Sequence, residues 1–546
     1  MAEYSAQSAA AGSAARAASP AAAAAPVADT RTGKVRGVVS DGISIFKGIP
    51  YGAPTSGANR FRKPQPPQAW SGVRDALLYP NMAPQPPAPP RGLFASWTDP
   101  TTIGEDCLGL NVWTPGLRDG GKRPVMVWFH GGDFASLSGS RSVFDGTRLA
   151  KRGDVVLVTV NHRLNAFGFL YLGQLLGEYA DSANAGMLDL VAALEWVRDN
   201  IAEFGGDPGN VTIFGQSGGG GKVATMMAMP AGKGLFHRAI IQSGTYARNA
   251  HLEAMSADAA TKHAQTLLAA LDIKPADARK LLDVPMEALV AATVKTAQGK
   301  DRTVWRPVAD GKVLPAGPSW PSAPEVSADV PLMLGTTATE MSMLMGTPRP
   351  ETFDLDEDGM RQQLSRWFGP AQLDEVIALF RKKSPNATPG RLYFDISTAV
   401  VFRRGAWRHC DLKAAHGTGE RSDAVLRTAK APVYLYEIDW VTPVDGGKWG
   451  SPHSMEHPFV FDNVALSASI VGASQAEPQK LADQISPTWI AFARTGNPNN
   501  PAIPHWPAYT VPERATMVFD TQSKAEKMFR EDERVLTASA AEKDAL

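Results

Sequence analysis

The sequence predicts an α/β fold in which helices flank a mostly parallel central sheet. Short apolar runs, often β-branched, are the first observation, and runs of this kind are typical of strands buried on both faces. These runs lie at residues 125–129, 155–160, 211–214, 239–242 and 331–334. The second observation is a segment of helical period at residues 189–204, between two of the runs. Strand–helix–strand alternation favours a doubly wound architecture.

Composition limits the classes of function. Of 546 residues, 44% are hydrophobic and 20% are charged, which is typical of a globular protein. The 55 basic and 55 acidic residues give a formal net charge of zero, so nothing favours nucleic acid as a partner. No apolar run reaches the length of a membrane-spanning helix. The chain has the length for large loop and helical insertions into one fold, and the sequence leaves its oligomeric state open.

The start of the chain differs from the rest. Fifteen of the first 28 residues are alanine, and few of the others can bury apolar surface. We therefore expect a disordered tail at residues 1–30, followed by a single α/β domain at residues 31–546. An export leader that was removed or replaced stays open, and with it the choice between a cytoplasmic and an exported protein.

The cysteines and histidines indicate neither a disulfide framework nor a metal site. Cys107 and Cys410 are far apart and lack metal or redox spacing, so we expect two separate, buried thiols. Histidines outside the motifs described below show no paired spacing for a metal ligand set. We therefore expect no metal and no cofactor.

The sharpest motif is Gly-Gln-Ser-Gly-Gly at residues 215–219. It directly follows the predicted strand 211–214 and precedes a segment that can form a helix. A G-x-S-x-G turn between strand and helix is the nucleophile elbow of the α/β-hydrolase fold. Ser217 is then the candidate nucleophile. A phosphate-binding loop would need glycine where Gln216 stands and Ser or Thr where Val223 stands, so this alternative is discarded.

A serine nucleophile needs donors that bind the oxyanion it creates. The predicted strand 125–129 ends in His-Gly-Gly-Asp-Phe at residues 130–134. Glycines at the carboxyl end of a strand allow backbone N–H groups to face a cleft. With the residue after the nucleophile, this loop predicts an oxyanion hole formed by Gly132, Asp133 and Gly218.

From residue 33 to about residue 509 the chain resembles the type-B carboxylesterases, a family that includes bacterial para-nitrobenzyl esterases and the cholinesterases. Six segments carry the resemblance. They are Phe-Lys-Gly-Ile-Pro-Tyr at 46–51, Arg-Phe at 60–61, Glu-Asp-Cys-Leu-Gly-Leu-Asn-Val at 105–112, Asn-His-Arg-Leu at 161–164, Asn-Ile-Ala-Glu-Phe-Gly-Gly-Asp-Pro at 200–208 and Gln-Ser-Gly at 242–244.

The resemblance implies a Ser–Glu–His triad. The acid is expected in the segment at residues 335–340 and is Glu340, and the base opens the segment at residues 453–461 and is His453. His457 is the rival base, and the motif alignment favours His453, with His457 lining the pocket or capping a loop. The implied reaction is hydrolysis of a small-molecule carboxylic ester through an acyl-enzyme on Ser217, without a cofactor.

Four positions depart from the family pattern. Gln216 stands where Glu often precedes the nucleophile, Asp133 replaces a usual glycine, and Gly109 replaces a common aromatic residue. No cysteine precedes Cys107, so the family's disulfide at that point is absent. The φ angle of Asp133 is less free than that of glycine, which puts the geometry of the oxyanion loop in question.

Two other functions stay open at this point. One is a non-catalytic binding or adhesion module of the same fold, against which the intact Ser217, Glu340 and His453 argue. The other is hydrolysis of amides or carbamates by the same triad, which these motifs do not separate from ester hydrolysis.

Overall fold

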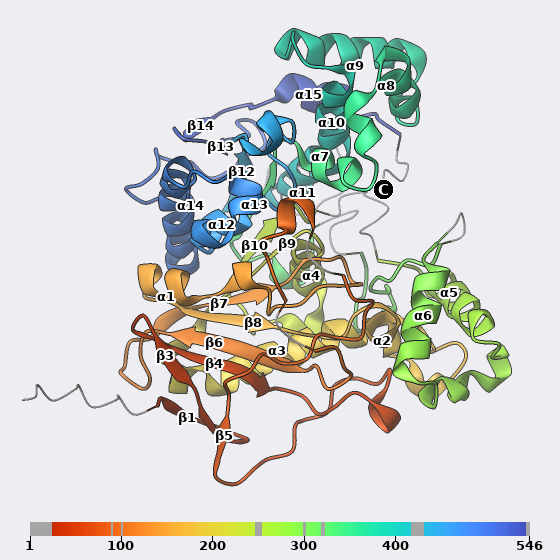
Figure 1. The fold of residues 1–546 in the computed structure, drawn as a ribbon, viewed down its shortest axis with the longest axis vertical. Coiled ribbons are helices and arrows are strands. Elements are labelled where there is room, and N and C mark those ends of the chain that lie inside the picture. The colour runs from red at the N-terminus through yellow and green to blue at the C-terminus, as the bar shows by residue number, and fades with distance from the viewer. Residues whose placement is uncertain are drawn as a thin grey trace, which may run out of the picture.

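The computed structural model describes residues 25–88, 91–99, 102–245, 254–298, 302–317, 323–415 and 431–541. In this part of the chain an eleven-stranded sheet forms the centre (Figure 1). Its strands in spatial order are β14 (Lys524–Glu526), β13 (Thr516–Phe519), β12 (Val433–Ile438), β11 (Leu332–Thr337), β10 (Arg238–Gln242), β9 (Gly206–Gln216), β7 (Arg123–Phe129), β8 (Val156–Val160), β6 (Gly109–Thr114), β4 (Ile43–Pro50) and β3 (Val38–Ser40). The strands from β13 to β8 pair in parallel, and the outer strands at both edges pair antiparallel.

The predicted α/β-hydrolase architecture is confirmed. The five predicted strands are β7, β8, β9, β10 and β11, with ends that differ by a few residues. The predicted helix at residues 189–204 is α3 (Ala185–Asn200), which continues into a short 3₁₀ turn at Ile201–Phe204. The segment after the serine motif forms α4 (Gly218–Ala228).

The central sheet is apolar on both faces, as the continuous apolar strands predict. Along β7, Met126 and Trp128 pack into one core with α1 (Thr147–Gly153) and α14 (Ala476–Thr495). Val127 and Phe129 alternate with them and pack into the opposite core with α3 and α4. Successive side chains of a strand point to opposite faces, so one strand contributes to both cores.

Further helices are inserted between and after the strands of the parallel sheet (Figure 1). They are α2 (Asn165–Phe169), α5 (Ala257–Ala270), α6 (Met286–Thr296), α7 (Glu340–Gly346), α8 (Glu357–Leu364), α9 (Pro370–Lys383), α10 (Pro389–Thr398), α11 (Arg404–Ala414), α12 (His457–Val460), α13 (Ala468–Val471) and α15 (Glu531–Thr537). Helices α7 to α10 enclose an apolar cluster of their own. A π-helical turn at Ala399–Arg403 joins α10 to α11 and brings Phe402 to the cavity described below.

A small second sheet corrects the predicted boundary of the N-terminal tail. Strand β1 (Val27–Thr30) pairs antiparallel with β2 (Gly33–Arg36), which pairs with β5 (Val73–Asp75). Residues 27–30 therefore belong to the fold, because Ala28 is buried in the main core. Residues 1–24 lie outside the described part of the chain, so the tail itself stays a prediction.

Two further expectations concern the thiols and the membrane. Cys107 and Cys410 are both free and buried, which confirms two separate thiols. Burial raises the pKa of each thiol above its ordinary value, so both are held as unreactive neutral groups. Across the described residues, no helix combines the length and the apolar character that crossing a membrane requires.

Candidate active site

The parallel sheet brings the predicted site segments to one edge. Phe129 at the end of β7 pairs with Gly215 near the end of β9, and Gln242 at the end of β10 pairs with Gly335 in β11. Because parallel strands point the same way, the segments that follow β7, β9 and β11 emerge side by side. This is the edge of an open α/β sheet at which ligands bind.

Ser217 occupies a strained turn between β9 and α4. Its backbone has φ +58° and ψ −127°, in a region that residues with side chains rarely adopt. A Cβ atom added to Gly219 would lie 2.0 Å from the carbonyl oxygen of Phe129. The Ser217 N–H donates to the carbonyl of Gln242 at 2.8 Å, which ties the turn to β10. Glycine is thus required beside the serine, as the motif predicts.

The predicted oxyanion loop lies against this turn. A Cβ atom on Gly218 would lie 2.2 Å from the Cα atom of Asp133, so the two backbones meet directly. Gly132 has φ +79° and Asp133 has φ +51°. In the described residues the N–H groups of Gly132 and Asp133 donate to no protein acceptor, and Gly218 opens α4, where the N–H groups have no intrahelical partner. The loop keeps its shape although Asp133 replaces glycine.

His453 and Glu340 form a buried pair. Nδ1 of His453 lies 2.5 Å from Oε2 of Glu340, and neither side chain is more than 4% exposed. The other carboxylate oxygen of Glu340 accepts a hydrogen bond from the Thr337 N–H at 2.8 Å and one from the Ser243 hydroxyl at 2.6 Å. Glu340 also begins α7, where the helix dipole favours a negative charge. The carboxylate is thus held in one orientation toward the imidazole.

Neighbouring charges set the pKa of His453. Burial lowers this pKa, but the charge of Glu340 and its hydrogen bond outweigh burial, with smaller contributions from Glu456 and Asp133, and the net shift is upward. Glu456 is buried as well, and burial together with the charge of Glu340 raises its pKa to about 7. Near neutral pH Glu456 is therefore partly protonated, and its protonation depends on the charges of Glu340 and His453.

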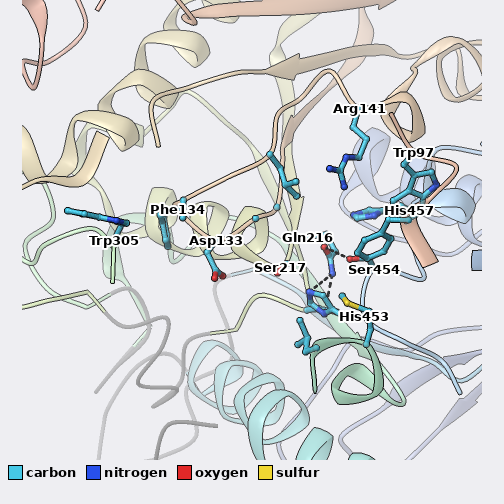
Figure 2. Close-up of a pocket in the computed structure, with 18 of the residues that line it drawn as sticks. Trp97, Asp133, Phe134, Arg141, Gln216, Ser217, Trp305, His453, Ser454 and His457 are labelled. Atoms are coloured by element: carbon cyan, nitrogen blue, oxygen red, sulfur yellow. Dashed lines mark hydrogen bonds between the residues drawn. The ribbon is translucent and has the colours of Figure 1, made fainter. Parts of the chain in front are cut away.

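The structure brings Ser217 and His453 to the same cavity without a hydrogen bond between them. Instead, the amide nitrogen of Gln216 lies 3.2 Å from Nε2 of His453, and its carbonyl oxygen accepts from the Ser454 hydroxyl at 3.2 Å (Figure 2). Contacts of this kind often tighten only when substrate binds. Nε2 of His453 is thus occupied by the Gln216 amide and makes no hydrogen bond to Ser217 in this structure.

A cavity of about 450 Å³ opens over Ser217. Figure 2 shows Trp305, Phe134 and Asp133 toward one end and Arg141, Trp97 and His457 toward the other. The rival base His457 lines this cavity, as expected of it, and makes no hydrogen bond to the predicted triad residues. Among the described residues no cluster of side chains could hold a metal ion.

Sequence reasoning missed Lys222 and Arg141. Lys222 lies in the first turns of α4, is fully buried, and donates from Nζ to the His130 carbonyl at 2.9 Å. Its amino group therefore holds the start of the predicted oxyanion loop from behind. A lysine directly after a run of glycines in a buried helix was the available signal. Arg141 carries no such signal, because only the fold brings it to the cavity.

A mostly parallel sheet with a serine on a strained strand–helix turn, beside a buried His–Glu pair, defines a hydrolase of the α/β-hydrolase class. The model of the carboxylesterase family matches residues 24–536. The chain therefore belongs to the carboxylesterase family and is a carboxylic ester hydrolase, as the resemblance implied.

Relatives and solved structures agree with this assignment. The chain is 35% identical over 501 residues to the para-nitrobenzyl esterase of Bacillus subtilis, covering 91% of this chain and 95% of that protein. It is 31% identical over 502 residues to the phenmedipham hydrolase of Pseudarthrobacter oxydans, and the match covers 90% of this chain and 94% of that protein. A carboxylesterase structure from Geobacillus stearothermophilus superposes with a TM-score of 0.79 at 36% identity. The superposition covers 93% of this chain and 99% of that structure.

The first prediction concerns Asp133. An Asp133→Gly variant should keep kcat/KM for a small neutral ester within about tenfold, a barrier change of ~1.4 kcal/mol, because glycine adopts the φ of +51° without strain. The measurement compares neutral, anionic and cationic esters in both proteins. Loss of every ester by orders of magnitude would mean that the side chain holds the loop, and selective loss of cationic esters would mean that the carboxylate selects substrates.

The second prediction concerns Lys222, whose pKa burial lowers to about 7 against the opposing effect of Asp133. The unfolded chain binds this proton up to about pH 10.5, so wild-type stability rises with pH between these two values. Lys222→Met removes that gain. The melting temperature of the variant relative to wild type should therefore be highest below about pH 7 and decline at higher pH.

The same variant should show a lower kcat, because the His130 carbonyl loses its donor and the oxyanion loop is less firmly held. Thermal unfolding at about pH 6 and about pH 9 tests the first effect, and initial rates on one ester test the second. A relative melting temperature that increases with pH would contradict the assignment of a buried, titrating lysine.

Proposed function

We propose that Ser217, His453 and Glu340 act as nucleophile, general base and orienting acid in the hydrolysis of a small-molecule carboxylic ester. His453 takes the proton of Ser217 as the hydroxyl oxygen attacks the ester carbonyl. Glu340 orients the imidazole and stabilises its cationic form. The N–H groups of Gly132, Asp133 and Gly218 donate to the oxyanion of the tetrahedral intermediate.

The second half of the reaction uses the same groups. Protonated His453 gives its proton to the leaving alcohol, and the acyl group stays on Ser217. Water, deprotonated by His453, then attacks the acyl-enzyme and releases the carboxylic acid. No group outside this chain and water is required.

The contact of 2.5 Å between His453 Nδ1 and Glu340 Oε2 is the observation that carries this proposal. A buried carboxylate on Nδ1 leaves Nε2 as the basic nitrogen, and His453 lines the same cavity as Ser217. His457 has no such partner among the described residues, where both of its ring nitrogens are without a hydrogen bond. Among the buried histidines of the cavity, His453 alone is thus prepared to be a base.

The third prediction tests the nucleophile. Ser217→Ala should abolish ester turnover and leave the melting temperature close to that of wild type, because the hydroxyl makes no hydrogen bond within the described residues. An organophosphate should label Ser217 in the wild-type protein. Ser243 serves as the comparison, since its buried hydroxyl donates to Glu340 and is not available as a nucleophile. A label on Ser243 would refute the assignment.

The fourth prediction concerns pH. His453 must be neutral to accept a proton, and its pKa lies above the ordinary value of 6.5, so kcat/KM should rise with pH through a midpoint above that value. Glu340→Gln removes the charge that raises this pKa and leaves the burial that lowers it. The midpoint should move down in the variant, with a loss of rate of at least about tenfold.

The pH–rate profile of kcat/KM in both proteins is the measurement. Glu456→Gln is a useful comparison, because the charge of Glu456 also raises the pKa of His453, but by less than the charge of Glu340 does. The midpoint of the pH–rate profile should therefore move down by less in Glu456→Gln than in Glu340→Gln. An unchanged or higher midpoint in the Glu340 variant would contradict the pairing.

A further inference from the structure

One end of the cavity holds two polar side chains that the proposed reaction does not use. Arg141 and His457 line the cavity together with Trp97 and Phe144, and Figure 2 shows the Arg141 guanidinium directed toward the His457 ring. Phe94 stacks on Trp97 with ring centroids 4.8 Å apart. This end of the cavity, called here the Arg141 subsite, combines flat aromatic walls with a polar tip.

The imidazole of His457 has no hydrogen-bond partner in the described part of the chain. The residue is 5% exposed, and neither Nδ1 nor Nε2 makes a hydrogen bond there. Three aromatic rings surround it edge to face, with centroids at 5.2 to 5.6 Å: Trp97, Trp128 and Phe144. Aromatic faces are weak acceptors. Burial, aided by the charges of His453 and Arg141, holds the pKa of His457 well below its ordinary value, so the ring is neutral and has one N–H to donate.

Arg141 is only partly satisfied by its neighbours. Its Nε and Nη2 atoms donate to Oδ2 of Asp99 at 3.2 and 3.0 Å, and Oδ1 of Asp99 accepts from the Ser138 hydroxyl at 2.6 Å. Within the described part of the chain, Nη1 donates to no acceptor, although the residue is 7% exposed. Because Asp99 compensates the guanidinium charge and His457 is neutral, the subsite offers two donors and no net charge.

We propose that the Arg141 subsite binds the leaving alcohol of the ester through a neutral carbonyl or hydroxyl oxygen that accepts from Arg141 and His457. The aromatic walls suit a flat spacer between this oxygen and the scissile ester. A carboxylate is disfavoured, because Asp99 already neutralises the arginine and Asp133 adds a negative charge to the same cavity. The substrate class is therefore an aryl ester with a second, uncharged oxygen on the alcohol.

The placement on the alcohol side rests on the proposed function. A general acid must lie next to the oxygen it protonates, so the leaving alcohol lies on the His453 side of Ser217. His457 follows His453 in the same segment, and Figure 2 shows both on the side of the cavity that contains Arg141. Trp305 and Phe134 line the opposite end, which is left for the acyl group.

The experiment compares two substrates of nearly equal shape. Para-acetylphenyl acetate carries a carbonyl where para-ethylphenyl acetate carries a methylene group. Arg141→Met should reduce kcat/KM for the acetyl compound by about tenfold or more and leave the ethyl compound within about twofold, because only the first loses a hydrogen bond from a charged donor. Each substrate is compared with itself across variants, so differences in leaving-group reactivity cancel.

Two further variants complete the design. His457→Leu should show the same selective loss and serves as the test if Arg141→Met does not fold. Arg361→Met is the matched control, because this partly exposed arginine on α8 pairs with Asp374 and does not line the cavity. It should leave both substrates unchanged.

Inhibition by the product alcohols separates the subsite from the reaction. Para-hydroxyacetophenone should inhibit wild type more strongly than para-ethylphenol, and Arg141→Met should remove that difference. If wild type cleaves neither acetate, calorimetric binding of the two alcohols replaces the inhibition assay, and tighter binding of para-hydroxyacetophenone that depends on Arg141 would mean that the proposed function fails while the subsite is supported. Equal losses for both substrates in the Arg141 and His457 variants would overturn the subsite.

Two other outcomes would overturn the proposed charge of the ligand or its placement on the alcohol side. A preference for para-acetoxybenzoate that depends on Arg141 would mean that the subsite binds an anion. A selective loss on para-nitrophenyl levulinate relative to the pentanoate, with no effect on the phenyl acetates, would mean that the subsite holds the acyl group.

Discussion

The close approach of the loop after β7 to the turn after β9 is the constraint on which the site depends. The backbones of Gly218 and Asp133 meet so closely that a single added methyl group would overlap. The same contact places the free N–H groups of the loop beside Ser217 and fixes the strained backbone of that serine. Parallel pairing of β7 with β9 maintains the contact, because it holds the ends of both strands at one level. The large apolar cores on both faces of the sheet supply the rigidity that keeps this strain in place.

Buried charge is the second organising feature. The charge of Glu340 disfavours ionisation of Glu456 and raises its pKa, and Ser243 donates to both carboxylates, at 2.6 and 3.2 Å. The proton that this repulsion retains can remain on Glu456, because Glu340 has the imidazole as a partner. Lys222 lies behind the predicted oxyanion loop, where its Nζ donates to the His130 carbonyl.

The sequence predicts the scaffold well, because local patterns determine it. The five apolar runs and the helix at residues 189–204 follow from periodicity, and the glycines around Ser217 follow from a turn that excludes side chains. The partners of Ser217 are different. Glu340 and His453 are each separated from it by more than a hundred residues, and only resemblance to a family singled them out among many acids and ten histidines. The boundary at residue 30 was wrong because Val27 and Ala28 pair and pack through contacts distant in the sequence.

The polar residues of the cavity were the least predictable, and physical reasons explain why. Arg141 follows a loop after β7, Asp99 precedes β6, and His457 begins α12, so three separate connections assemble one subsite. In the sequence each looks like an ordinary loop residue, and only their burial in the folded protein marks them as parts of a site. A buried imidazole without a partner is costly unless something else supplies one. The stability lost there is consistent with a site shaped for a bound molecule. The buried His130 differs, because its ring packs against His162 and its Nδ1 donates to the Gly131 carbonyl at 2.9 Å.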